Sequence, residues 1–315
     1  MASVLVFLDV PDLPLPRAAR ELLTLAGSIG EPVVAAARRP DPELLAAFAS
    51  YGAGKVYEPA GELDGVLVAA KAGFLAAAAT AEQPAAILLG NSFEDREIAG
   101  RTGIKLSSGV VTDAVAVAPD LAVTKSVLAG SYTSTCRVQS GTPIITVKAN
   151  SIEPAPEQEG APAPELVELP VPEPGPAARV TSRTGKRVSG RPELSEARVI
   201  VAGGRGVEGN FGPGEELADL LGGAVGASRA ATDAGWIEHS AQVGQTGKTV
   251  SPQLYISVGI SGAIQQKAGM QTAKVIVAVN KDADAPVFEI ADFGVVGDLF
   301  SVLPQAAEEI RKRRS

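Results

Sequence analysis

Short β-branched apolar runs alternate with alanine- and leucine-rich stretches over the first 150 residues of the chain. Apolar runs of this length are typical of buried strands, and longer stretches with helical spacing are typical of helices. The pattern predicts strands at 4–8, 32–36, 86–89, 110–117 and 144–147, and helices at 17–27, 42–51, 63–81 and 94–102. Such alternation predicts a three-layer α/β domain at the N-terminus.

A tract rich in proline, glutamate and alanine follows. Residues 151–164 read SIEPAPEQEGAPAP. They have no apolar period, which predicts an exposed loop. Short runs at 165–169 and 178–182 are expected as edge strands that return to the first domain, and 185–192 as a hinge. We therefore expect a first domain over residues 1–190 and a second over 191–315.

The second domain has more continuous apolar runs. They predict strands at 198–202, 224–227, 254–258, 274–279 and 287–290, and a helix at 213–221. Uninterrupted apolar strands are typical of parallel sheets that are covered on both faces. Glycine, serine, asparagine or aspartate follows nearly every run, and ligands of such sheets bind at the carboxyl ends of strands. The sequence thus predicts a Rossmann-like parallel sheet with a ligand site.

Charge and residue counts narrow the possible functions. The net charge of −8 argues against nucleic acid or an anionic membrane as a partner. One cysteine and one histidine, His239, offer neither a metal cluster nor a Ser-His-Asp triad beside a nucleophile elbow. The first residues lack the basic region of a signal peptide, so we expect a cytoplasmic protein without membrane insertion. A redox cofactor that the protein merely binds and tunes fits this pattern better than acid–base catalysis.

A glycine motif raises one alternative. Gly204, Gly206 and Gly209 form a G-x-G-x-x-G directly after a strand, as in sites for dinucleotides. An NAD site needs an acidic residue about 20 positions later, where this chain has Ser228 and Arg229. That arginine is compatible with NADP, so an NAD(P)-dependent oxidoreductase using the 204–209 loop remains an alternative.

Three further segments carry small polar residues, two at predicted strand ends and one in a loop before a strand. They read GASRAATDAGW from Gly226, QVGQTGKT from Gln242 and SVGISGAIQQKAGM from Ser257. The second lacks the spacing of a phosphate-binding P-loop. In the third, Ser261 is expected to cap a helix that starts near Gly262, where free N–H groups would suit a diphosphate. Each segment taken alone is also compatible with an ordinary turn.

Together these segments resemble the alpha subunit of electron transfer flavoproteins. The resemblance is specific in PQLYISVGISGAIQQKAGM and VIVAVNKDADAPVFEIADFGVVGDLF, with GGRG, VGASRAATDAG and QVGQTGK before them in order. It covers about residues 194–304 and is looser over the first domain. It implies that the second domain binds FAD. The FAD contacts that it implies are Arg205, Ser228, Arg229, Val243, Gly244, Gln245, Thr246, Ser261, Gly262, Ala263, Ile264, Gln265, Gln266, Asn280, Asp298 and Leu299.

The resemblance also implies partners and residue roles. Family members pair with a beta subunit, which holds AMP where AMP is present. They carry electrons from acyl-CoA and related dehydrogenases, as in fatty acid β-oxidation, to a membrane quinone oxidoreductase, and are not themselves enzymes. Arg229 is expected to offset charge on the reduced flavin, and Thr246 to bond flavin N5. A flavin-free structural subunit is a further alternative, in which loss of Arg229 would affect only stability.

One position departs from the family pattern. The resemblance implies a histidine where this chain has Gln266. Glutamine can donate a hydrogen bond near flavin O2 but carries no charge. We therefore expect a less positive potential for the semiquinone couple than in a relative with histidine.

Overall fold

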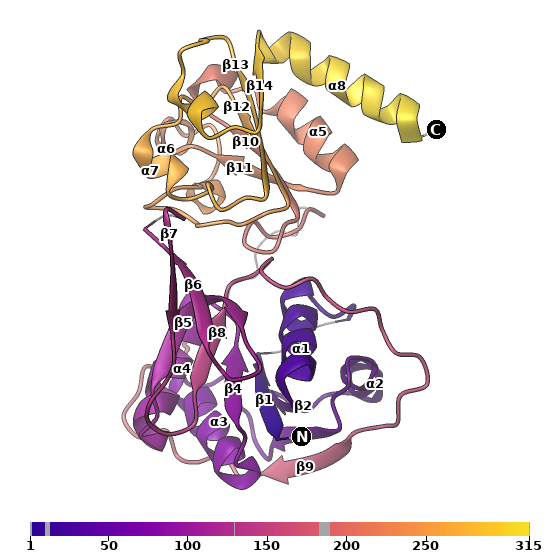
Figure 1. Ribbon diagram of the computed structural model, residues 1–315, viewed down its shortest axis with the longest axis vertical. Coiled ribbons are helices and arrows are strands. Elements are labelled where there is room, and N and C mark those ends of the chain that lie inside the picture. Colours follow the sequence, from indigo (N-terminus) through magenta and orange to yellow (C-terminus); the bar gives the residue numbers. More distant parts are fainter. Residues whose placement is uncertain (1, 10–12, 129, 183–189, 315) are drawn as a thin grey trace. The chain divides into compact units, whose positions relative to one another are not determined.

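The computed structural model describes residues 2–9, 13–128, 130–182 and 190–314 (Figure 1). The chain forms two compact units, one of Met1–Ser126 with Thr133–Gly185 and one of Val127–Tyr132 with Lys186–Ser315. Each unit has its own β-sheet. None of the helices in the described residues is long and apolar enough to cross a bilayer.

The first unit is built on a nine-stranded sheet in the order β7-β6-β5-β8-β4-β1-β2-β3-β9. Its strands are β1 (Ser3–Leu8), β2 (Glu31–Ala36), β3 (Lys55–Pro59), β4 (Ala86–Leu89), β5 (Val110–Val117), β6 (Val123–Val127), β7 (Tyr132–Cys136), β8 (Ile144–Val147) and β9 (Glu165–Leu169). Its helices are α1 (Arg17–Ile29), α2 (Pro42–Ser50), α3 (Ala69–Glu82) and α4 (Phe93–Leu106). The seven neighbouring strands β9, β3, β2, β1, β4, β8 and β5 run parallel to one another. Strand β6 pairs antiparallel with β5.

Helices cover both faces of this sheet. Val4 and Val6 of β1 lie in one apolar core with α1 and α2, and Leu5 and Phe7 lie in the other with α3 and α4. This alternation follows from the period of two in a strand, which sends successive side chains to opposite faces. The three-layer arrangement that the sequence predicts is thereby confirmed.

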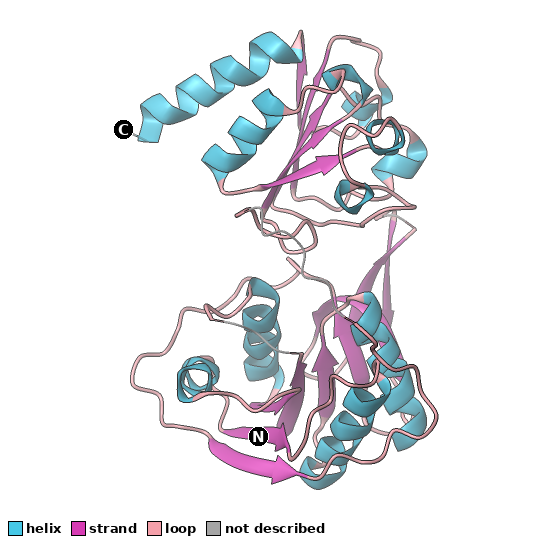
Figure 2. Cartoon of the chain, turned by 180° about the vertical axis from the view of Figure 1, so that it is seen from behind, coloured by secondary structure: helices cyan, strands magenta, loops and turns pink. Residues whose placement is uncertain are grey.

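The second unit has a five-stranded parallel sheet in the order β11-β10-β12-β13-β14. Its strands are β10 (Val199–Gly203), β11 (Ala224–Ala227), β12 (Leu254–Val258), β13 (Val275–Asn280) and β14 (Phe293–Val296). Its α-helices are α5 (Gly212–Leu221), α6 (Arg229–Asp233), α7 (Ile264–Lys267) and α8 (Leu299–Arg314), and its 3-10 turns are η1 (Arg205–Val207), η2 (His239–Ala241) and η3 (Pro286–Glu289). Helices α5 and α8 pack side by side on one face (Figure 2). This is a doubly wound α/β order, as the sequence predicts.

Several boundaries differ from those expected. The apolar run at 287–290 is not a strand: Pro286 opens the turn η3, and the last strand of the sheet is β14, which follows it. Helix α3 begins at Ala69 rather than 63, and Val66 in the preceding loop forms a bridge to Arg179. That single bridge replaces the strand expected at 178–182, and most of the hinge expected at 185–192 lies outside the described residues. Strands β3, β6 and β7 are additional to those expected.

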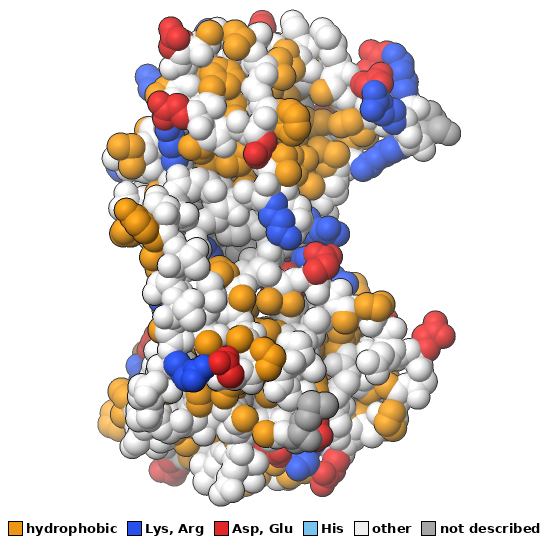
Figure 3. Space-filling model, in the orientation of Figure 1, with side chains coloured by type: hydrophobic (Ala, Val, Ile, Leu, Met, Phe, Trp, Pro, Cys, Tyr) orange, Lys and Arg blue, Asp and Glu red, His pale blue; other side chains and the backbone are white. Residues whose placement is uncertain are grey.

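Strand β14 is the edge of its sheet and is unusually apolar for an exposed strand. It pairs with β13 on one side only, within the described residues. The side chain of Phe293 is 65% exposed, and Val296 is 59% exposed. Figure 3 shows, on the face of this unit that it draws, hydrophobic side chains exposed between charged ones. Edge strands of isolated domains usually carry charges or prolines instead.

Candidate cofactor site

A cavity of about 1180 Å³ opens at the carboxyl ends of the strands in the second unit. It lies where the strand order reverses, between β10 and β12, which is the usual position of ligands in a doubly wound sheet. The lining residues are Arg205, Gly206, Glu208, Ser228, Arg229, Ala230, Trp236, Gln242, Val243, Gly244, Gln245, Thr246, Gly259, Ile260, Ser261, Ala263, Gln265, Gln266, Asn280, Lys281, Asp282, Ala285, Gly297, Asp298, Leu299 and Phe300.

Most of the residues that the resemblance implies as FAD contacts thus meet in one cavity. Gly262 and Ile264 do not line it. Gly262 has φ +85°, and a Cβ there would lie 2.4 Å from the backbone N of Val287, so this glycine is needed for close packing. The side chain of Ile264 is 78% exposed. Helix α7 starts at Ile264, and Ala263 is its N-cap residue. The prediction that Ser261 caps this helix is therefore wrong.

The glycines of the G-x-G-x-x-G motif lie in close contact with other parts of the second unit. A Cβ on Gly204 would lie 2.4 Å from the carbonyl oxygen of Gly259, and one on Gly206 would lie 2.8 Å from the Cα of Gly259. Gly209 lies against the ring of Trp236. The turn after β10 is η1, and α5 begins only at Gly212, so no long helix starts at these glycines as it does in a nicotinamide site. The motif therefore joins two loops that form the cavity wall.

One side of the cavity carries arginine side chains, which are cationic, and a serine hydroxyl, which can form hydrogen bonds. Ser228 is buried, and its hydroxyl has no hydrogen-bond partner among the described residues. A buried polar group without a partner is costly, so this hydroxyl suits a ligand atom. Beside it, Arg229 is 70% exposed and pairs with Asp233 at 3.1 Å. Arg205 lines the same cavity from η1.

A hydrogen-bonded chain leads from α6 to the loop after η2. The Thr232 hydroxyl donates to Gln242 Oε1 at 3.2 Å, and Gln242 Nε2 donates to the Thr246 hydroxyl at 2.9 Å. Thr232 and Gln242 are buried, whereas Thr246 is exposed to the cavity. Because Thr246 accepts a bond from the protein, its own O–H can donate to a ligand.

On the other side of the cavity, two polar side chains form hydrogen bonds with the backbone of the lining loops. Asn280 Nδ2 donates to the carbonyl of Ile260 at 3.0 Å, and its Oδ1 accepts from the N–H of Asp282 at 3.0 Å. Asp298 Oδ1 accepts from the N–H of Phe300 at 2.9 Å, at the start of α8. These two side chains therefore brace the loops as well as lining the cavity.

Several lining residues are not among the contacts predicted from the sequence. Trp236, Gln242 and Lys281 are among them. Gln242 begins the quoted segment QVGQTGKT, and Trp236 ends the segment GASRAATDAGW, so both were adjacent to the expected contacts. A signal for Trp236 is that it is the only tryptophan in the chain.

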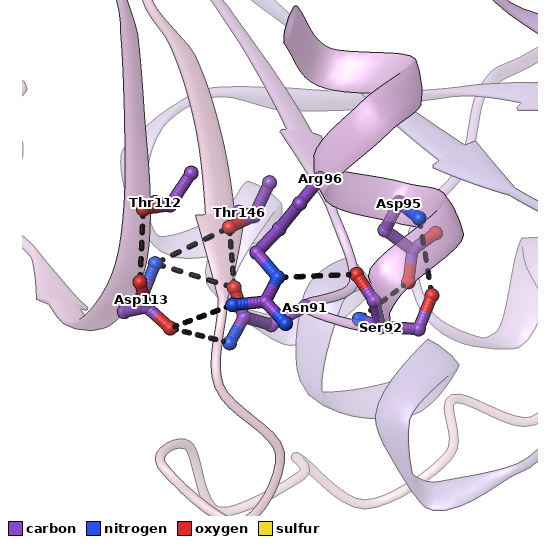
Figure 4. Close-up of polar contacts among 7 residues, drawn as sticks. All are labelled: Asn91, Ser92, Asp95, Arg96, Thr112, Asp113 and Thr146. Carbon is purple, nitrogen blue, oxygen red and sulfur yellow. Dashed lines mark hydrogen bonds and ion pairs between the residues drawn. The ribbon is translucent and has the colours of Figure 1, made fainter.

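A polar cluster in the first unit is satisfied from within (Figure 4). Asp113, at φ +62° in β5, accepts bonds from Asn91 at 2.9 Å and Thr112 at 2.8 Å, and Thr146 donates to Asn91 at 2.6 Å. Burial would raise the pKa of Asp113, but these hydrogen bonds and the charge of Arg96 lower it overall. The cluster lies at the irregular register of β5 with β8, and none of its buried side-chain atoms lacks a partner among the described residues.

The cavity is chemically suited to a large anionic ligand with polar ring atoms. It offers two arginines, an unpaired buried hydroxyl and free donors on threonine and glutamine side chains. A diphosphate would find cationic and hydroxyl partners there, and a heteroaromatic ring would find donors. Among the described residues, there is no group of histidine, cysteine and carboxylate side chains that would hold a metal ion.

Comparison with known proteins gives matches over both units. Residues 4–174 match the family model described as the electron transfer flavoprotein domain, and residues 193–271 match that of the electron transfer flavoprotein FAD-binding domain. The chain is 45% identical to the electron transfer flavoprotein subunit alpha of Mycobacterium leprae over the full length of both. It is 46% identical to that of Mycobacterium tuberculosis, again over both full lengths. It is 40% identical to that of Syntrophomonas wolfei, over 99% of this chain and 100% of the relative.

Proposed function

Because the chain belongs to the electron transfer flavoprotein alpha-subunit family, we propose that it binds one FAD in the cavity of its second unit and acts as an electron carrier. The observation that carries the proposal is the cavity at the switch point of the sheet, within and beside the segment that matches the FAD-binding domain. Its volume of about 1180 Å³ is large enough for a dinucleotide.

We assign the phosphate and ring contacts from the chemistry of the lining residues. Arg205 and Ser228 would hold anionic oxygens, since one is a cation and the other has an unpaired buried hydroxyl. Gln266 would donate from its amide, and Thr246 from its hydroxyl, to acceptor atoms of the isoalloxazine ring. FAD, when bound, supplies the ability to accept and release electrons. The remaining implied contacts would position its ribityl and adenosine parts.

Arg229 would favour a negatively charged ring. Two unit charges about 4 Å apart interact by ~1 kcal/mol in water and ~4 kcal/mol at a surface dielectric of about 20. Because the Arg229 side chain is 70% exposed, the effect should lie within this range rather than above it. For a one-electron couple, 1.4 kcal/mol corresponds to about 59 mV, so the expected contribution is about 40–170 mV.

The resemblance to the family also supports a proposal for the partners. We propose that the chain pairs with a beta subunit, which would hold AMP, and that the pair works in the cytoplasm. Acyl-CoA and related dehydrogenases would donate electrons, and a membrane quinone oxidoreductase would accept them. The chain would thus carry electrons between enzymes without turning over a substrate of its own.

An absorption spectrum of the chain, purified alone and together with its beta partner, tests the proposal. Absorption bands at about 380 and 450 nm that disappear when FAD is released on denaturation are expected, because these are general bands of an oxidised flavin. A complex that stays colourless after FAD is added would contradict the proposal. A nicotinamide titration would then test the NAD(P) alternative.

An Arg229→Gln variant separates a cofactor contact from a purely structural residue. The substitution removes the charge and keeps a polar, though shorter, side chain. We expect the flavin potential to fall with little change in thermal stability, since the side chain is mostly exposed. A variant that changes stability alone would favour the flavin-free structural subunit.

A further inference from the structure

The hydroxyl of Tyr255 is a buried polar group directly behind the cavity. Tyr255 lies in β12, its side chain is fully buried, and it belongs to the same apolar cluster as Ile200, Val250 and Met270. Burial raises the pKa of this phenol above its ordinary value, so the hydroxyl stays protonated. It has one hydrogen-bond partner among the described residues, the amide of Gln266, with Nε2 2.9 Å from Oη.

Gln266 connects that hydroxyl to the cavity. It lies in α7, a four-residue helix, and its side chain lines the cavity. A helix this short has little stability of its own and does not fix a long side chain. The Gln266 Oε1 lies 3.7 Å from the position of a Cβ on Gly244, on the loop that leads to Thr246. The amide is thus held between the core and the loop.

The two hydrogens of the amide nitrogen can serve different partners. One is directed to the Tyr255 hydroxyl, and the other remains for an acceptor in the cavity. We propose that Tyr255 is a positioning residue for the cofactor, whose hydroxyl anchors the Gln266 amide so that its second N–H is presented to the flavin ring. The inference rests on the proposed function, because it requires a flavin in this cavity.

The anchor should affect the reduced cofactor more than the oxidised one. Reduction adds negative charge to the flavin ring, and a hydrogen bond to a charged acceptor is stronger than one to a neutral acceptor. An amide that has lost its anchor rotates and presents this donor only part of the time. The loss of the hydroxyl should therefore weaken the binding of reduced FAD more and make the reduction potential more negative.

The test is potentiometry on a Tyr255→Phe variant of the full chain, loaded with FAD and copurified with its partner subunit. We expect the ratio of the affinities for reduced and oxidised FAD to fall about threefold to tenfold. A tenfold change is a shift of about −30 mV in a two-electron couple. Tyr57→Phe is the matched control, because it removes a phenol hydroxyl that bonds Glu82 at 2.8 Å in the first unit. Its potential should equal that of the wild type.

A second background separates positioning from mere stability. In Gln266→Leu, the amide is absent, and adding Tyr255→Phe should leave the potential unchanged. If the tyrosine only stabilises the core, Tyr255→Phe would lower the melting temperature and leave the potential unchanged in both backgrounds, which would overturn the inference. A wild type without FAD would instead refute the proposed function.

A shorter amide tests the same bond if Tyr255→Phe does not fold. Gln266→Asn keeps the amide but removes one methylene, so the amide no longer reaches both the hydroxyl and the cavity. We expect a negative shift of the potential in the same direction. A potential equal to that of the wild type would overturn the inference.

Discussion

Gly269 supports the cofactor loop from behind without lining the cavity. It is buried just after α7, and its carbonyl accepts from the N–H of Val250 at 2.8 Å. A Cβ at this position would lie 2.4 Å from both the Cα and the N of Gly244. Gly269→Ala must therefore move the loop that carries Thr246 by about 1 Å to restore ordinary contact distances.

The size of the effect follows from that overlap. Adding one methyl group to a well-packed site costs about 1–3 kcal/mol. If displacement of the loop bears this cost, FAD should bind about 5- to 150-fold more weakly, since about 1.4 kcal/mol is a factor of ten. The substitution introduces no polar group into the apolar core, so we expect the sheet of the second unit to remain folded.

The assay is an FAD titration of the apoprotein with its partner subunit, alongside thermal unfolding. Gly100→Ala is the matched control, because an added Cβ there meets nothing within 4 Å. The control should bind FAD as the wild type does. If Gly269→Ala binds FAD within twofold of the wild type, the loop is not what this glycine supports, and the reasoning is wrong.

Three other predictions concern single side chains. Gln266→His should shift the flavin potential in the positive direction, because imidazole can carry a charge, and potentiometry that finds no such shift would contradict the assigned role. Binding of FAD should quench the fluorescence of Trp236, the only tryptophan and a lining residue, and an unchanged emission would place FAD elsewhere. Burial raises the pKa of Glu21 from 4.5 to about 7 despite the nearby Arg17, so the folded state keeps a proton that the unfolded state loses. The first unit should then lose up to ~3 kcal/mol of stability as the pH rises from about 4.5 to 7. Urea unfolding near pH 5 and pH 8 measures this difference in stability, and the stability of Glu21→Gln should depend less on pH. A wild-type stability that is the same at both pH values would contradict the prediction.

The strand-end residues could be predicted because they follow uninterrupted apolar runs. Arg205, Ser228 and Ser261 each come after such a run, and parallel strands bring their carboxyl ends to one edge. The confirmed α/β fold follows from the same alternation of runs. The error at the last strand has a local cause: VFEI and FGVV are both apolar, but Pro286 places a turn at the first of them.

Other features depend on contacts that periodicity does not encode. Tyr255 fits the pattern of a core strand residue, and only the folded chain shows its hydroxyl beside Gln266. The glycine motif at 204–209 has the spacing of a phosphate turn, yet Gly206 packs on Gly259 of another loop. Spacing in the sequence indicates that the backbone needs room, but not whether a ligand or a second loop fills it.

The apolar edge strand β14 has a consequence for how the cell must make this protein. A strand with one unpaired edge and exposed hydrophobic side chains is a template on which further chains can add strands and aggregate. We expect the chain to self-associate when it is produced in excess of its partner. Balanced synthesis of the two subunits would then protect the protein during assembly, and unequal expression should show first as insoluble alpha chain.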